Sequence, residues 1–88
     1  MPLFIVERNF PDGIDVVVGD PRIIGIHQDL NIKWFCSFLS NDAKKTYCVH
    51  EAASAEIVRQ AAQRAGIPAD EIVEVHSPVG PGLAPLFD

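Results

Sequence analysis

The sequence predicts an α+β sandwich in which one antiparallel sheet carries two helices on one face. Residues 54–66 have apolar side chains at helical spacing, and residues 32–51 contain two β-rich runs separated by a turn. A short apolar strand pattern both precedes and follows them. The resulting order is strand, helix, hairpin, helix and strand, which is the split βαβ arrangement of a ferredoxin-like βαββαβ fold.

The first strand is expected at residues 3–9, where an apolar run is followed by the turn signal Pro11-Asp12-Gly13. The structure of residues 14–20 is not predicted, because β-branched residues and helix breakers are mixed there. Asp20 followed by Pro21 is a typical helix start, and a short helix is expected over residues 21–30. On this helix His27 is expected to pack within the apolar stripe.

A β-hairpin is expected from residues 32–40 and 45–51, and the length of its loop decides which side chains meet. A three-residue loop would pair Cys36 with Cys48 and Trp34 with His50, and would place all four on one face. A two-residue loop would instead pair Cys36 with Val49 and send Cys48 and His50 to the face opposite Cys36.

We prefer the three-residue loop, because it places four apolar side chains together beneath the helices, namely Phe35, Leu39, Tyr47 and Val49. In that loop Ala43 would occupy a position that favours glycine, at a cost of about 1 kcal/mol.

The second helix is expected to begin after Ser54, a good N-cap, and to end at Gly66. The last strand is expected at residues 71–76. We therefore expect a ferredoxin-like domain over residues 1–76, followed by a Pro- and Gly-rich tail over residues 77–88 without a regular element.

Composition narrows the class of protein. The formal net charge of −5 has the wrong sign for a phosphate backbone, so nucleic acid is not an expected partner. No apolar run suits a membrane span or a secretion signal, and two cysteines are too few for a secreted disulfide scaffold, so a cytoplasmic location is expected.

An 88-residue chain with 48% hydrophobic residues should have apolar surface to spare, which favours a homodimer. Trp34 and Phe38 are candidates for the face that a second copy covers.

An ordered set of residues along most of the chain is similar to a known family. The set comprises Trp34, Ser37, the Asp42 turn with Lys45-Thr46, Cys48, Glu51-Ala52, Ala65-Gly66-Ile67-Pro68 and Glu74-Val75. It resembles the bacterial family called domain of unknown function 4242, which includes small nickel-binding proteins. The resemblance implies a ferredoxin-like homodimer without established catalytic activity. It also implies nickel binding, because at least one member of the family binds nickel.

The candidate metal ligands are imidazole, thiol and carboxylate groups. Cys48 and His50 suit Ni²⁺, Zn²⁺ or Cu²⁺, and Cys36 could add a third ligand. Glu74 and His76 lie two residues apart on the last strand and could chelate from the surface. Apolar packing is the preferred interpretation of the two cysteines. For Glu74 and His76 the preferred interpretation is that they are polar side chains exposed to solvent.

Two other functions stay open. A pocket between sheet and helices, lined by Trp34, Phe35, Tyr47 and His50, would indicate a small-molecule-binding or enzymatic protein. A plain interaction module whose tail docks on a partner is the third hypothesis. No catalytic motif and no signature of an organic cofactor is present in the sequence, so enzymatic activity is not expected.

Overall fold

The computed structural model describes residues 1–14, 20–77 and 79–81. Its elements are β1 (Leu3–Asn9), α1 (Pro21–Asp29), β2 (Lys33–Leu39), β3 (Lys45–Glu51), α2 (Ala55–Ala65) and β4 (Glu71–Val75). This order confirms the predicted βαββαβ arrangement. Residues 15–19, most of the stretch left without a prediction, lie outside the described part, as do residues 78 and 82–88 of the tail.

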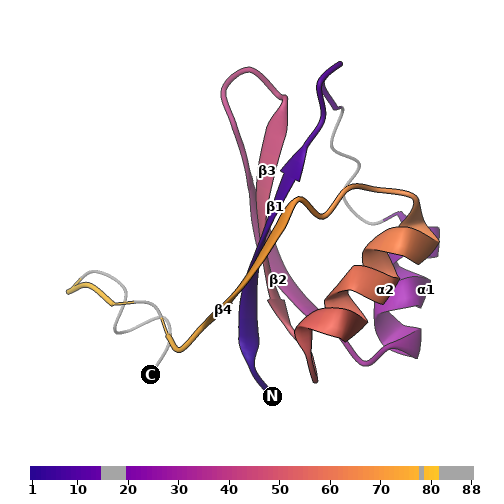
Figure 1. The fold of residues 1–88 in the computed structure, drawn as a ribbon, viewed down its shortest axis with the longest axis vertical. Coiled ribbons are helices and arrows are strands. Elements are labelled where there is room, and N and C mark those ends of the chain that lie inside the picture. The colour runs from indigo at the N-terminus through magenta and orange to yellow at the C-terminus, as the bar shows by residue number, and fades with distance from the viewer. Residues whose placement is uncertain (15–19, 78, 82–88) are drawn as a thin grey trace.

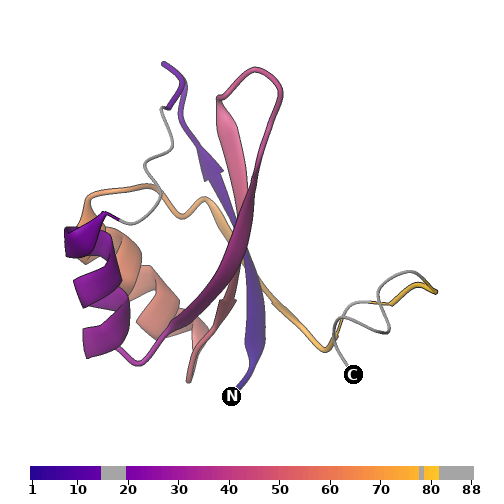
Figure 2. The same ribbon diagram turned by 180° about the vertical axis from the view of Figure 1, so that it is seen from behind.

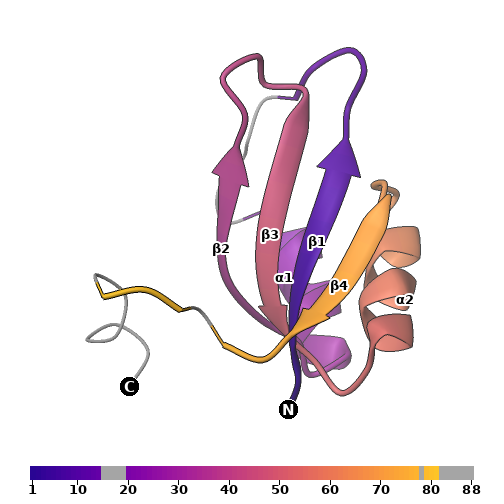
Figure 3. The same cartoon turned by 60° about the vertical axis from the view of Figure 1, so that its left-hand side comes forward.

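The four strands form one sheet in the order β2-β3-β1-β4, with every neighbouring pair antiparallel (Figure 3). Each helix connects two parallel strands that flank a third, as in ferredoxin-like folds. Both helices lie side by side on one face of the sheet, and the chain after β4 leaves on the other side (Figures 1 and 2). The opposite face of the sheet, which we call the open face, carries no helix of the described residues.

Both helices begin at the predicted caps, and α2 ends at the predicted glycine. The Asp20 side chain accepts a hydrogen bond from the Arg22 backbone N–H at 2.9 Å, and Pro21 follows it as the first helical residue. Ser54 accepts from the Ile57 N–H in the same way at 3.2 Å. Gly66 ends α2 with a left-handed φ of 71°, which glycine adopts without the steric penalty of a side chain.

The core lies between the sheet and the helices. Alternate residues of β1 are buried, and among them Phe4 and Val6 are 1% and 0% exposed. They pack in one cluster with Ile26 of α1 and with Val58 and Ala61 of α2. The same alternation places the third buried residue of β1, Arg8, beneath the helices.

The hairpin register differs from the preferred prediction. Cys36 pairs with Val49, and Ser37 takes the place opposite Cys48, so the expected pairing of Cys36 with Cys48 is wrong. Cys36 is exposed and Cys48 is buried. The two cysteines therefore lie on opposite faces of the sheet, as the alternative register required.

The loop is longer than either prediction assumed. The Ser40 N–H donates to the Lys45 carbonyl at 2.9 Å, so the loop consists of residues 41–44. Ala43 adopts a φ of 60°, the conformation expected to favour glycine at this position.

A β-bulge between Trp34 and Cys36 explains why half of the preferred prediction is nevertheless confirmed. Trp34 pairs with His50 as expected, but the register shifts by one residue before Cys36, which pairs with Val49. The bulge therefore inserts Phe35 as an extra residue, and the strand follows one predicted register on each side of it.

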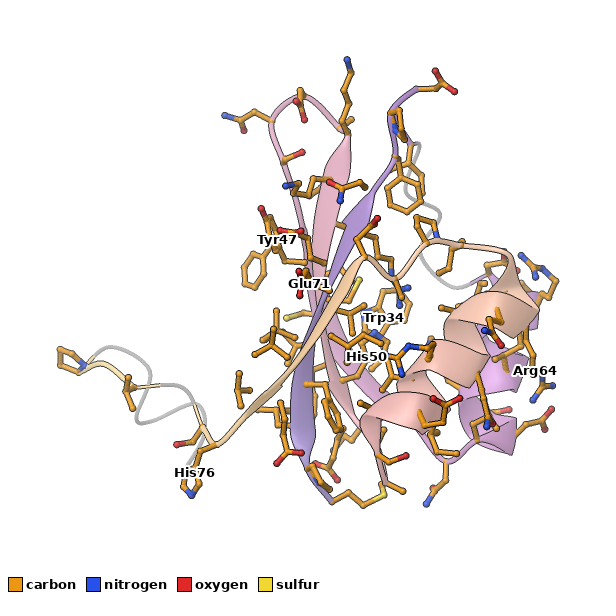
Figure 4. The ribbon with its side chains drawn as sticks, in the orientation of Figure 1. Trp34, Tyr47, His50, Arg64, Glu71 and His76 are labelled. Atoms are coloured by element: carbon orange, nitrogen blue, oxygen red, sulfur yellow. The ribbon has the colours of Figure 1, made fainter. Side chains whose placement is uncertain are left out.

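The bulge consequently makes part of the face assignment wrong: Leu39 lines the helix-covered side as expected, but Trp34, expected on the face that a second copy covers, lies there as well. His50 and Trp34 lie between the sheet and the helices, whereas Tyr47 lies on the open face (Figure 4). Phe35 and Tyr47 were expected beneath the helices, but they are 44% and 37% exposed.

Candidate functional site

A pocket of about 380 Å³ lies between the helix-covered face of the sheet and the two helices. This volume is at the lower end of the range found for ligand pockets, roughly 300–1,000 Å³. Apolar residues of α1, α2 and the sheet form most of its wall. Its uncharged polar and titratable side chains include His27, Ser37, Thr46, Cys48 and His50, and its charged ones are Arg8, Asp20 and Arg22.

His50 is the most unusual of these side chains. It lies on β3 between Phe4 of β1 and Trp34 of β2, and it is only 2% exposed. Neither of its ring nitrogens has a hydrogen-bond partner among the described residues. A buried polar atom left without a partner loses its hydration without compensation, at about 1–3 kcal/mol for each atom. Such a group indicates a place where a ligand, a metal ion or water completes the site.

The charge state of His50 follows from its surroundings. Burial lowers its pKa to about 3, with the Arg8 guanidinium and the ring of His27 adding to the effect. The imidazole is therefore neutral at pH 7, with a lone pair on one nitrogen and a proton on the other.

A second imidazole and an indole stand beside it. The ring centre of His27 lies 5.2 Å from that of His50 and 5.9 Å from that of Trp34. Burial, followed by the charge of Arg8, also lowers the pKa of His27. The Trp34 indole N–H donates to Ser37 Oγ at 3.0 Å, which satisfies the indole and fixes its plane. The pocket thus contains two neutral imidazoles within reach of one ligand.

Arg8 supplies a buried, fixed positive charge at the pocket. It is 4% exposed, and its Nη1 donates to the Pro68 carbonyl at 2.6 Å. The ion pairs found between described residues do not include it. A buried guanidinium that lacks a carboxylate partner is costly, so its place beside the pocket is informative about the ligand.

The predicted metal ligands do not meet at one point. Cys48 lines the pocket with His50, and its thiol lies 3.7 Å from Thr46 Oγ1. Cys36 is on the open face, and Glu74 and His76 are exposed at the end of β4 and just beyond it. Figure 4 shows His76 on the side of the sheet away from the helices. In residues 1–14, 20–77 and 79–81, no group of three or more His, Cys, Asp and Glu side chains is arranged to hold a metal ion.

Arg8 and His27 line the pocket but were not among the predicted site residues. The alternation of β1 does place Arg8 on the face of Phe4 and Val6, and the helical spacing of α1 places His27 on its apolar stripe. Both signals were present in the sequence. They indicate only burial, however, and contact with His50 follows from the tertiary structure.

The open face also has a distinct character. Its exposed apolar residues include Phe35 (44%), Phe38 (65%), Tyr47 (37%) and Val73 (50%). Glu7 pairs there with Lys45 Nζ at 3.5 Å. Within the described part of the chain, no helix has the length and apolar character needed to cross a membrane.

Comparison with known proteins gives two matches. Residues 4–75 match the family described as nickel responsive protein SCO4226-like. The fold is similar to the crystal structure of SCO4226 from Streptomyces coelicolor A3(2), with a TM-score of 0.69 and 25% sequence identity over 88% of this chain and 99% of that chain. No curated protein matches the sequence.

Proposed function

The chain belongs to the SCO4226-like family of nickel responsive proteins, and from this premise we propose that it binds Ni²⁺, or a similar divalent transition metal, through histidines in its pocket. The observation that carries the proposal is His50. Its ring is 2% exposed, yet both of its nitrogens lack a partner among the described residues.

The donor set suits this class of metal. Imidazole nitrogen is a common ligand for nickel, zinc and copper, and it must be neutral to bind. Burial and the charge of Arg8 lower the pKa of both His27 and His50, so neither needs to lose a proton at pH 7. Cys48 lines the same pocket and could add a thiolate. Two or three protein ligands would leave further coordination positions to water or to a bound molecule.

We further propose that two copies pair through the open face. The exposed aromatic side chains of Phe35, Phe38 and Tyr47 give this face the apolar character of an interface. An isologous sheet-to-sheet dimer would cover it and leave the pocket of each subunit on the outside. The free thiols of Cys36 and Cys48 suit a reducing compartment, so the cytosol remains the proposed location.

Isothermal titration of tag-free protein with Ni²⁺ tests the metal proposal. We expect stoichiometric binding that His50→Gln weakens at least tenfold, because the amide is a poorer ligand than imidazole. His76→Gln is the matched control, since His76 is exposed and outside the pocket. Equal binding by wild type and His50→Gln, together with weaker binding by His76→Gln, would move the site from the pocket to the surface. No binding by the wild type would reject the proposal.

The pocket also favours a second candidate, the binding of a small organic ligand. This alternative required a cavity that contains a histidine, and the 380 Å³ pocket has His50 and Trp34 in its wall. Phe35 and Tyr47, which were expected to line it, do not. The remaining lining residues decide what kind of molecule would fit.

A further inference from the structure

The charge of the pocket indicates the chemical class of an organic ligand. We propose that the pocket binds a small organic carboxylate, whose negative group pairs with Arg8 and hydrogen-bonds to the imidazole of His50. The inference rests on the second candidate function and names its ligand; it does not require a metal.

The first step of the argument is the balance of charge. Among the described residues, three charged side chains line the pocket. The carboxylate of Asp20 accepts from the Arg22 backbone N–H at 2.9 Å, and the Arg22 guanidinium donates to the Ala65 carbonyl at 3.0 Å. The side chains of Asp20 and Arg22 form no ion pair, but their charges sum to zero, so Arg8 is the surplus cation among the described lining residues. An anion of single charge would neutralise it.

The second step is the supply of hydrogen-bond donors. A guanidinium has five N–H donors, and Nη1 of Arg8 makes the only side-chain bond from this residue to the described part of the protein. A carboxylate can accept two parallel N–H bonds from such a group. A neutral His50 has one N–H to donate, and no described residue accepts it. Arg8 and His50 thus have N–H donors without acceptors among the described residues, and a carboxylate would provide those acceptors.

The third step is the rest of the ligand. The rings of His27 and Trp34 and the apolar side chains of Ile23 and Ile26 line the same pocket. These surfaces suit an apolar or aromatic body, because aromatic rings stack favourably in offset or tilted arrangements. The volume of about 380 Å³ limits that body to a small molecule.

Matched acids and amides test this inference on the unmodified, tag-free and metal-free protein. The probes are benzoate with benzamide, phenylacetate with phenylacetamide, and butyrate with butyramide. Each pair has the same shape but differs in charge. The readout is the indole N–H resonance of Trp34, the one tryptophan of the chain, in ¹H–¹⁵N spectra. We expect at least one acid to shift this resonance in a saturable manner, with an affinity at least tenfold above that of its amide.

Variants identify the partner of the carboxylate. Arg8→Gln should remove the preference for the acid, whereas Arg64→Gln should keep it, because Arg64 is an exposed cation on α2 that pairs with Asp29 outside the pocket (Figure 4). If Arg8→Gln does not fold, the acid and amide comparison on the wild type still decides. Amides that bind as tightly as their acids would overturn the carboxylate inference and leave the organic-ligand function intact. If no acid and no amide shifts the resonance, both are rejected. A nickel titration of the same sample reports separately on the metal proposal.

Discussion

Acid should destabilise the metal-free protein through His50. This residue has a pKa of about 3 in the folded chain and about 6.5 in the unfolded chain. Between these two values the unfolded state binds more protons, so the free energy of unfolding rises with pH. The contribution of the neutral imidazole is complete above about pH 6.5, and it is lost progressively as the pH falls towards 3.

The magnitude follows from the size of this interval. One pH unit changes the free energy of unfolding by about 1.4 kcal/mol for each group that titrates only in the unfolded state. From pH 7 to pH 5 the unfolded histidine becomes almost fully protonated, so His50 should remove about 2 kcal/mol of stability. This is a large share of the roughly 5–15 kcal/mol that stabilises a typical domain.

The comparison is with His50→Leu, which has a similar volume and no titrating group. Because both ring nitrogens of His50 lack partners among the described residues, leucine should fit at pH 7 with little loss or a small gain in stability. Urea unfolding at pH 7 and pH 5, in buffer containing a chelator, measures the loss in each protein. The loss should be about 2 kcal/mol smaller in His50→Leu.

The remaining titratable groups act in both proteins and cancel in this comparison. His27 has a lowered pKa as well and contributes with the same sign, whereas the fixed charge of Arg8 does not change in this range. His76→Leu, which changes an exposed histidine, should leave the wild-type loss unchanged. Equal losses in wild type and His50→Leu would refute the reasoning and place the titrating group elsewhere.

Three further predictions concern the fold and the assembly. Phe38→Lys should convert a dimer into a monomer in sedimentation experiments, because Phe38 is 65% exposed on the open face; a wild type that stays monomeric at millimolar concentration contradicts the dimer. Ala43→Gly should stabilise the protein by about 1 kcal/mol and Gly66→Ala should destabilise it by a similar amount, because both positions have positive φ. If both substitutions shift the melting temperature in the same direction, this reasoning is wrong. Ser54→Ala should remove about 1 kcal/mol through the lost N-cap of α2, and an unchanged urea midpoint would show that the cap is dispensable.

The order of elements and the family were predictable from the sequence. The amphipathic spacing of α2, with Ser54 before it and Gly66 after it, depends on local chemistry that the tertiary structure did not override. The expected family is confirmed by the match of residues 4–75 to the nickel responsive SCO4226-like family.

The faces of the hairpin were not predictable by the same reasoning. Side chains alternate strictly along a strand, so a shift of one residue reverses every assignment that follows it. The preferred register assumed regular pairing from Trp34 to the loop, whereas the chain has a bulge at Phe35 and a loop of residues 41–44. The result was correct for the pairing of Trp34 with His50 and wrong for Cys36.

The site was predicted in part. His50 and Cys48 were singled out for their chemistry, and both line the pocket. Arg8 was not named as a site residue and His27 was expected only to pack, because alternation and helical spacing predict that a side chain is buried but not which other buried group it meets. Only the packing of α1 over the sheet brings the ring centre of His27 to 5.2 Å from that of His50.

The bulge in β2 has a consequence for how the two faces of the sheet can vary. If Phe35 were deleted, Trp34 and Cys36 would become neighbours, and their pairings with His50 and Val49 would form a regular ladder. The inserted Phe35 thus adds an aromatic group to the solvent-exposed side of the sheet, and the side chains that line the pocket keep facing it. If the proposed dimer forms through the open face, a change at this one position would alter that interface and leave the lining of the pocket in place.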